Sequence, residues 1–318
     1  MNKDLAILIT GASGFFGRHL LRVIDSQNVR VLGRTKPVDI NSNKFIKSEI
    51  SGETDFSGCF KGVEIVIHCA ARAHIMTESV SNPLWEYRSV NTFGTLRLAQ
   101  QAAKEGVNRF IYLSSIKVNG ETTTDSLPYT EQDCDAPQDF YGVSKMEAEH
   151  GLRIIAAETG MEVVIIRPPL VYGPGVKANF LSLLKLSSKG LPLPFGAVHN
   201  QRSMVYVDNL VYFVIKCIDH PAAANETFLV SDGDDVSLTT LLKYMGSAFG
   251  RAPRLVPIPV FIFKLLGMLA GKQAVVDRLV GDLQADSSKA RMLMDWKPPF
   301  TVEQGIQGTV DEFLKGNK

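Results

Sequence analysis

Short apolar runs alternate with longer amphipathic segments over the first half of the chain. Five runs have the length and β-branched content of strands, and they are continuous, as expected for a parallel sheet that is covered on both faces. They span 5–10, 29–33, 63–68, 109–114 and 162–167. The segments between them predict helices over 15–26, 83–105 and 141–159. Strands alternating with helices predict a doubly wound α/β fold with a parallel Rossmann sheet.

The pattern changes after Arg167. Segments rich in proline and glycine at 168–180 and 190–196 predict loops. A strand and a helix are expected over 204–218, a further strand over 226–232, and helices with proline breaks from Ser237 onward. We therefore expect two interleaved parts. Residues 1–168 and 203–232 would form the Rossmann domain, and 169–202 with 233–318 a smaller C-terminal part.

Composition and charge exclude several classes of protein. With 318 residues, 45% hydrophobic and 21% charged, the chain is not expected to be disordered. Lys plus Arg number 34 and Asp plus Glu 33, which gives no electrostatic indication of nucleic-acid binding. The four cysteines are scattered without a CxxC pair, so we expect no metal site and mostly buried, reduced thiols in a cytoplasmic protein. The first residues enter an apolar strand directly, without a signal-peptide pattern.

The longest apolar run, 260–271, needs a separate interpretation. It is interrupted by Lys264 and is shorter than the ~20 residues of a spanning helix, so no integral membrane association is expected. A helix packed in the C-terminal part is the preferred interpretation. A peripheral helix that faces a membrane is the alternative.

Two motifs carry candidate chemistry. In "TGASGFFG", Gly11, Gly14 and Gly17 follow the first strand and open a helix, which suits a dinucleotide pyrophosphate at the helix N-terminus. In "YGVSK", Tyr141 and Lys145 are four residues apart and hence on one face of a helix. A nearby ammonium group would stabilise the phenolate, so the pair could exchange a proton with an alcohol oxygen while a hydride moves to or from nicotinamide.

These motifs, in this order, resemble the extended short-chain dehydrogenase/reductase family of nucleotide-sugar epimerases, dehydratases and reductases. The resemblance includes "HCAA" at 68–71, Asn91 in the following helix, and "SSIKVNG" at 114–120. It implies Ser115, Tyr141 and Lys145 as catalytic residues, with Asn91, Ser114 and Lys117 in support. Lys117 stands where a small neutral residue is more usual, and it could contact the substrate or the pyrophosphate, or be a solvated loop lysine.

The resemblance also implies contacts to both ligands. For the cofactor, the expected residues are Gly11, Ser13, Gly14, Phe15, Phe16, Gly17, Arg34, Glu49, Ile50, Ala70, Ala71, Arg72, Tyr141, Lys145 and Pro168. For a UDP-linked sugar, they are Ser115, Lys117, Arg202, Arg278 and Asp282. Arg202 matches an arginine that grips the nucleotide diphosphate. Leu283 or Gln284 lies near the position that limits the C2 substituent, and neither is as bulky as tyrosine, which favours an N-acetylated sugar.

The reaction at C4 stays open between two alternatives. Ser115 is followed by Ile116 and Lys117, where 4,6-dehydratases carry an acidic pair, which counts against dehydration. The form of the motifs favours a 4-ketoreductase in bacterial surface-polysaccharide precursor synthesis, with a UDP-sugar 4-epimerase as the alternative. A non-catalytic NADP-binding regulatory protein is a distant third. Relatives dimerise through the two long helices, so a homodimer is expected.

The end of the second strand bears on the cofactor. About 20 residues past the glycine loop, an acid usually binds the ribose of NAD, but Gly33 and Arg34 occupy this place. Arg34, with Arg18 or Lys36, could hold a 2′-phosphate instead. The sequence therefore predicts a preference for NADP(H), with NAD(H) possible, and this favours the reductase.

Overall fold

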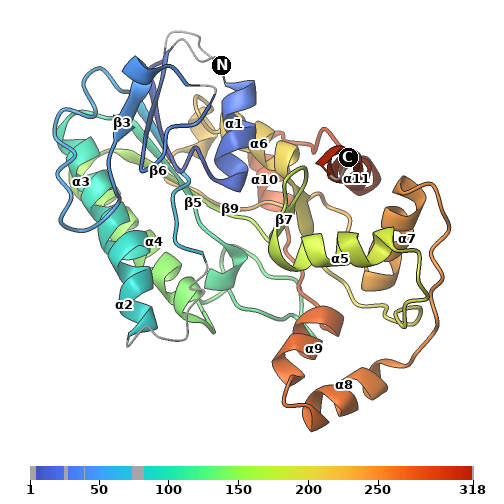
Figure 1. Cartoon of the computed structure of the whole chain (residues 1–318). Helices are drawn as coiled ribbons and strands as arrows, with labels where there is room; N and C mark the ends of the chain where they lie inside the picture. Colours follow the sequence, from blue (N-terminus) through green and yellow to red (C-terminus); the bar gives the residue numbers. More distant parts are fainter. Residues whose placement is uncertain (1–4, 25–27, 39, 74–81, 317–318) are drawn as a thin grey trace.

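The computed structural model describes residues 5–24, 28–38, 40–73 and 82–316. Its centre is a parallel sheet with the strand order β3-β2-β1-β4-β5-β6-β9 (Figure 1). The order reverses between β1 and β4, and in open α/β sheets ligands bind there, at the carboxyl ends of the strands. The strands are β1 (Ile7–Thr10), β2 (Val29–Gly33), β3 (Phe45–Lys47), β4 (Ile65–His68), β5 (Arg109–Leu113), β6 (Glu162–Arg167) and β9 (Thr227–Leu229).

Both faces of the sheet are buried, which explains the continuous apolar runs. In β1, Ile7 and Ile9 belong to one hydrophobic cluster and Leu8 to another on the opposite face. The first cluster is covered by α1 (Phe15–Val23) and α6 (Val207–Lys216). The second is covered by α3 (Thr95–Lys104) and α4 (Phe140–Thr159), and α2 (Pro83–Tyr87) and a π-helical segment (Arg88–Gly94) precede α3 and pack against α4.

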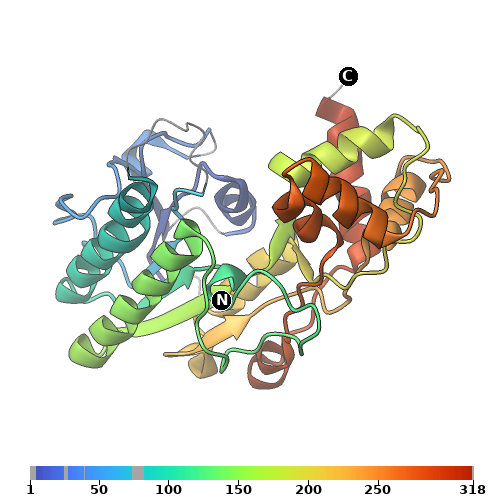
Figure 2. The same ribbon diagram turned by 90° about the horizontal axis from the view of Figure 1, so that it is seen from below.

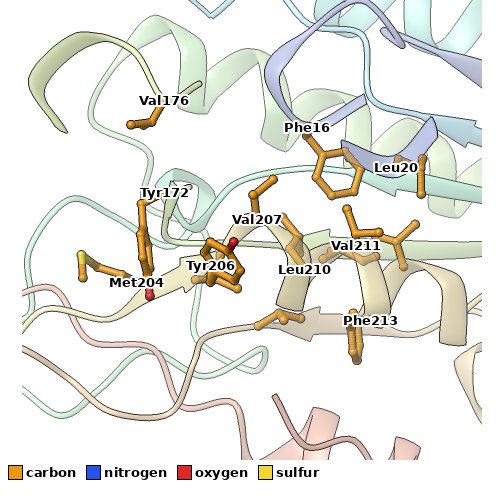
Figure 3. Close-up of a cluster of buried hydrophobic side chains, with 14 of the residues drawn as sticks. Phe16, Leu20, Tyr172, Val176, Met204, Tyr206, Val207, Leu210, Val211 and Phe213 are labelled. Carbon is orange, nitrogen blue, oxygen red and sulfur yellow. The ribbon is translucent and has the colours of Figure 1, made fainter. Parts of the chain in front are cut away.

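Packing between α1 and α6 joins distant parts of the sequence. Figure 3 shows Phe16 and Leu20 of α1 facing Leu210 and Val211 of α6. His19 adds a polar link, because its Nδ1 lies 2.8 Å from Asp208 Oδ1 and its Nε2 donates to the Pro174 carbonyl at 2.9 Å. The start of α1, where the glycine loop ends, is therefore fixed by the second half of the chain.

The C-terminal part is mainly helical. A small parallel sheet pairs β7 (Leu170–Tyr172) with β8 (Met204–Tyr206). Figure 2 shows the blue-to-green helices and most of the orange-to-red helices on opposite sides of the molecule. The helices are α5 (Ala178–Ser188), α7 (Leu238–Ala248), α8 (Val260–Leu269), α9 (Gln273–Val280), α10 (Ser288–Met294) and α11 (Val302–Gly316).

The fold class and most predicted elements are confirmed, and three elements were missed. The strands at 29–33 and 162–167 have the predicted bounds. The helix predicted over 15–26 ends at Val23, and residues 25 and 26 lie outside the described residues. β3 and β7 are three residues long, too short for a clear pattern, and β7 and the start of α5 lie inside the segment 168–180 that was predicted as a loop. Within 203–232, β9 pairs with β6 in the large sheet and α6 packs on one face of that sheet. In contrast, β8 pairs with β7 in the small sheet.

Of two expectations about burial, one is confirmed in part and the other is wrong. The run at 260–271 forms a helix, α8, that packs in the C-terminal part through Phe263, but Phe261 and Leu269 on it are 68% and 74% exposed. Of the free cysteines, Cys217 is buried and Cys134 is exposed, with the other two in between. Among the described helices, we find none with the length and apolar content needed to cross a bilayer.

Candidate active site

The glycine loop between β1 and α1 has the shape of a pyrophosphate-binding turn. Gly11 has φ +73°, and a Cβ there would lie 2.5 Å from the backbone nitrogen of Ala70. A Cβ on Gly17 would lie 2.4 Å from the Gly11 carbonyl oxygen, so this glycine lets α1 approach the loop. No side chain in the described part of the chain caps α1 at Gly14, which leaves first-turn N–H groups for an anion. The loop therefore fits the diphosphate of a dinucleotide.

The other residues predicted to bind the cofactor differ in how accessible their side chains are. Phe16 is 7% exposed and packs in the core, so its side chain is not available to a ligand. Pro168 is also buried, and its carbonyl accepts from the backbone nitrogen of Ile116 at 3.0 Å. The residues that are at least partly accessible are Ser13, Phe15, Glu49, Ile50, Ala70, Ala71 and Arg72.

Asn91 connects the loop after β4 to α4. Its Oδ1 accepts from the backbone nitrogen of Arg72 at 2.8 Å, and its Nδ2 donates to the Arg72 carbonyl at 3.0 Å. The same Nδ2 donates to Ser144 Oγ at 3.0 Å. Asn91 lies in the π-helical segment, and such turns are frequent at functional sites. The amide thereby holds the backbone at 72 against the helix that carries Tyr141.

A hollow of about 250 Å³ lies beside the glycine loop. It is lined by Ser13, Arg18, Leu21, Lys36, Pro37 and Val38. It therefore joins the glycine loop and α1 to the residues that follow β2, where the adenosine ribose lies in Rossmann folds. Arg34 is exposed but does not line it, so Arg18 and Lys36 are the cations at this place.

Tyr141 and Lys145 occupy the first turns of α4. Asp139 caps this helix, since its Oδ1 accepts from the backbone nitrogen of Gly142 at 2.7 Å. Lys145 is 1% exposed, and its Nζ donates to the Leu113 carbonyl at 2.8 Å. The same nitrogen lies 5.9 Å from the centre of the Tyr141 ring. The structure thus brings the two together at the carboxyl end of β5.

The electrostatics of this pair differ from the expectation. Burial lowers the pKa of Lys145 to about 7, although Cys69 and Glu149 act in the opposite direction. Burial, with the nearby Asp139 carboxylate, raises the pKa of Tyr141. In the protein alone, burial therefore outweighs the effect of the lysine, and the pKa of the phenol is raised. A positive charge on a bound cofactor would act in the opposite direction.

Ser115 lies on a turn that packs directly against the start of α4. A Cβ on Gly142 would lie 2.8 Å from the Lys117 carbonyl oxygen. Ser115 Oγ accepts from the backbone nitrogen of Lys117 at 3.3 Å, so its own hydroxyl hydrogen remains available for a ligand. Ser114, in contrast, is buried and donates from Oγ to Glu149 Oε1 at 2.5 Å. The two serines therefore face different surroundings.

Lys117 is held by two carboxylates and is not a solvated loop lysine. Its Nζ donates to Glu121 Oε1 at 2.9 Å and also to Asp139 Oδ2. Burial opposes the charged form, but these two carboxylates raise the pKa of Lys117. Since Asp139 caps α4, the lysine fixes the start of the helix on the turn that carries Ser115.

A buried ionic cluster below the site was missed in the sequence. Glu149 and Arg167 are 0% and 2% exposed, and Arg167 donates from Nε and Nη2 to the carboxylate, the shortest contact being 2.6 Å. Arg167 Nη1 also donates to Asn119 Oδ1 at 3.0 Å, and Nη2 to Asp135 Oδ1 at 2.8 Å. The available signal was spacing, because Glu149 is four residues after Lys145 on the same helix face.

The residues predicted to bind the sugar nucleotide meet at the other side of the site. Arg202 donates from Nη1 to the carbonyls of Arg278 and Gly281 at 3.0 and 3.1 Å. Arg278 forms an ion pair with Glu121 at 3.2 Å. Asp282 Oδ1 accepts from the backbone nitrogen of Gln201 at 2.6 Å, so this carboxylate is already bound. Arg202 and Arg278 thus lie together at the end of α9, next to the turn of Lys117.

Comparison with known proteins decides the family. The model of the NAD dependent epimerase/dehydratase family matches residues 7–231. The chain belongs to this family. It is therefore an NAD-dependent enzyme of the extended short-chain dehydrogenase/reductase type, an epimerase or a reductase, as the motifs predicted.

Two curated relatives span nearly the whole of this family member. A UDP-glucose 4-epimerase of Vibrio cholerae is 46% identical over 98% of this chain and 96% of its own length. An N-acetyl-alpha-D-glucosaminyl-diphospho-ditrans,octacis-undecaprenol 4-epimerase of Escherichia coli O157:H7 is 27% identical over 98% and 96%. Among solved structures, a UDP-glucuronic acid 4-epimerase from Bacillus cereus in complex with NAD has a TM-score of 0.79. It is 22% identical and covers 99% of this chain and 100% of its own, so it supports the fold.

Removing the buried carboxylate should destabilise the protein. Glu149→Gln leaves Arg167 charged and without its main partner, and breaking a buried pair on one side costs about 3–5 kcal/mol. Glu147→Gln on the same helix removes a partly exposed pair with Arg88 and should cost at most about 1 kcal/mol. Urea unfolding measures both free energies. Equal losses of unfolding free energy in the two variants would contradict the claim that the buried ion pair contributes more than the partly exposed one.

The stability of the ligand-free protein should rise with pH through Lys145. Its pKa of about 7 lies below the ordinary value of 10.5, so between these values the unfolded chain binds the extra proton. Stability therefore increases with pH in this window, by at most about 1.4 kcal/mol per unit. Lys145→Met should lose this dependence, whereas the exposed Lys104→Met should keep it. Urea unfolding at pH 7 and pH 9 measures the effect, and an unchanged slope in Lys145→Met would contradict it.

Proposed function

We propose that the chain interconverts the C4 epimers of a UDP-linked sugar. The relation to the Vibrio cholerae UDP-glucose 4-epimerase, 46% identical over 98% of the chain, carries this proposal. The 4-ketoreductase expected from the sequence is less well supported, because the relatives described above are named as 4-epimerases. Either reaction can use the same three residues, Ser115, Tyr141 and Lys145. An epimerase and a reductase therefore differ in whether the cofactor is retained between turnovers.

Each residue of the set has one task in the proposed mechanism. Ser115 donates a hydrogen bond to the C4 oxygen and orients it, and Tyr141 takes the C4 hydroxyl proton and later returns it. The glycine loop would hold NAD(P), which would supply hydride transfer at C4 and, in its oxidised form, a positive charge that favours the Tyr141 phenolate. Lys145 holds the helix face toward β5 through its bond to the Leu113 carbonyl. Inversion requires the 4-keto sugar to turn so that its opposite face would receive the hydride, after which Tyr141 returns the proton to the C4 oxygen.

The diphosphate would be held by Arg202, with Arg278 beside it. The Arg202 side chain is oriented by two carbonyls at the end of α9, and it forms no ion pair with a carboxylate among the described residues. A guanidinium group fixed in this way presents its remaining N–H groups to phosphate oxygens. Anchoring the diphosphate rather than the sugar leaves the sugar ring able to turn, as epimerisation requires.

The sugar itself is the finer part of the proposal. An N-acetylated hexose was favoured because neither Leu283 nor Gln284 is bulky. Leu283 is 8% exposed and packs with Ile116, whereas Gln284 donates from Nε2 to Asp235 at 2.7 Å. Since Ile116 follows the catalytic serine, the position near C2 lies close to the reacting centre. We therefore propose UDP-N-acetylhexosamines as substrates ahead of UDP-glucose and UDP-galactose.

A direct assay distinguishes the two reactions. Purified protein should interconvert UDP-GlcNAc and UDP-GalNAc without added cofactor, measured by nuclear magnetic resonance. Tyr141→Phe should lower kcat by about 10²–10⁴-fold, the usual contribution of general acid–base catalysis. The exposed Tyr212→Phe serves as the control and should keep full activity. Turnover that depends on added NADPH or NADH and on a 4-keto sugar would contradict epimerisation and restore the reductase.

The cofactor pocket is proposed to accept NADP(H) as well as NAD(H). The predicted preference for NADP(H) has no support from the comparisons, since the family is described as NAD dependent and the Bacillus cereus enzyme holds NAD. Among the described residues that line the hollow beside the loop, however, there is no carboxylate to repel a 2′-phosphate, and Arg18 and Lys36 lie there. We therefore infer tolerance of both cofactors.

Replacing these two cations tests that inference. Arg18→Ala with Lys36→Ala should weaken binding of NADPH about tenfold or more and leave NADH nearly unchanged, because only the 2′-phosphate gains from charge-assisted bonds. Arg22→Ala, which removes an exposed arginine of α1 outside the hollow, is the matched control. Fluorescence titration gives the dissociation constants. Equal losses for both cofactors, or none, would contradict a phosphate pocket here.

A homodimer and a cytoplasmic location complete the proposal. The helices through which relatives dimerise carry exposed apolar side chains here, with Trp85 at 56%, Phe93 at 39% and Ile154 at 58% exposure. Such side chains suit a helix–helix interface between two copies. We expect sedimentation velocity to give the mass of a dimer. The mass of a monomer would contradict the proposed homodimer.

A further inference from the structure

The α8 helix carries an apolar surface that the described part of the chain leaves exposed. We define the α8 face as Phe261, Leu265, Leu266, Met268 and Leu269, which are between 48% and 74% exposed. Val275 of α9, 63% exposed, continues it. Scattered apolar residues are common on protein surfaces, but six large ones on one short hairpin mark an interaction site.

The side of α8 that faces the protein is also apolar and is already packed. The exposed face is therefore a second apolar side of the helix. Phe263 stacks on Phe195 with ring centres 5.5 Å apart. A Cβ on Gly267 would lie 2.6 Å from Val276, which shows how closely α8 meets α9. Residues 261, 265, 268 and 269 follow the helical repeat and form a stripe away from these contacts. The helix is therefore apolar on two sides, and only one of them has a partner in the described chain.

Charge identifies the kind of partner. Residues 236–276 contain no aspartate or glutamate, but they contain five basic residues in a chain of net charge +1. Two of these, Lys264 and Lys272, are exposed at the α8 face and form no ion pair with a carboxylate among the described residues. The remaining three are Lys243, Arg251 and Arg254. Apolar side chains beside unpaired lysines are complementary to the interface of a bilayer that contains anionic lipid.

We propose that the α8 face docks on the surface of an anionic phospholipid bilayer. α8 has 10 residues and so is about 15 Å long, half the thickness of the hydrocarbon core, which means that it lies in the interface and does not cross it. Figure 1 has α8 and α9 at the lower end of the molecule, and in Figure 2, seen from below, these dark-orange helices lie in front, where a flat surface can reach them. Phe261, Leu265 and Leu269 enter the acyl boundary, and Lys264 and Lys272 contact lipid phosphates.

A second copy of the chain fits this face less well. In a twofold dimer the same patch meets itself, so Lys264 and Lys272 of both copies would enter one interface to which residues 236–276 contribute no carboxylate. Like charges close together oppose association, whereas an anionic membrane attracts them. Docking would also bring the substrate site close to the membrane, because Arg278 of α9 is bound to Glu121 beside the catalytic turn.

Vesicle sedimentation with the full-length protein tests the proposal. The protein should sediment with vesicles of phosphatidylglycerol and phosphatidylethanolamine, less so in 0.5 M salt, and not with phosphatidylcholine alone. Leu265→Ser with Leu269→Ser should abolish binding. Lys264→Gln with Lys272→Gln should weaken it about tenfold or more, from the contribution of each basic residue near an anionic surface. The control is Leu127→Ser, an apolar residue that is 85% exposed outside the α8 face, and it should bind normally.

Epimerase assays in solution keep this test separate from the proposed function. All of these residues lie outside the catalytic set, so every variant should turn over a soluble sugar nucleotide normally, which shows that it is folded. No binding to any vesicle, equal binding to neutral vesicles, or unchanged binding by the leucine variant would overturn the proposal. So would a change in sedimentation coefficient of the leucine variant in the absence of lipid, which would assign the face to contact between copies.

Discussion

The buried pair between Glu149 and Arg167 is the interaction on which the site depends. Neither charge can be left in the core without the other, so α4 and the carboxyl end of β6 have to meet at one fixed register. Ser114 donates to the same carboxylate, which adds the end of β5 to the cluster. Lys145 lies one helical turn before Glu149 and is thereby oriented toward the Leu113 carbonyl. The position of the candidate catalytic residues follows from an ion pair that touches no ligand.

A second ionic link fixes the start of the same helix. Lys117 joins Glu121 to Asp139, and Asp139 caps α4 immediately before Tyr141. The turn that carries Ser115 and the helix that carries Tyr141 are therefore connected both at the helix start and, through Glu149, two turns further along. Such pre-organisation matters because a small displacement of an acid–base residue costs much of its catalytic contribution.

The sequence predicted what local chemistry determines and missed what depends on tertiary contacts. Strand periodicity, the glycine spacing of residues 11 to 17, and the Tyr141–Lys145 pair are local patterns, and the structure has them where they were expected. The partners of Lys117 could not be foreseen, because Asp139 is 22 residues away and its distance is set by folding. The sign of the pKa shift at Tyr141 was wrong for a related reason. The spacing of four residues brings the ammonium near, but only the fold shows that burial dominates.

The chain of ionic contacts from α4 to α9 suggests how the C-terminal part acts on the catalytic part. Arg278 binds Glu121, Glu121 binds Lys117, and Lys117 binds the cap of α4. A diphosphate bound by Arg278 would compete with Glu121 for its guanidinium, and Glu121 would then interact more strongly with Lys117. Substrate binding would thus strengthen the contact that holds Tyr141 beside Ser115. This links the anchor of the nucleotide to the geometry of the reacting groups through three side chains, without a large movement of the backbone.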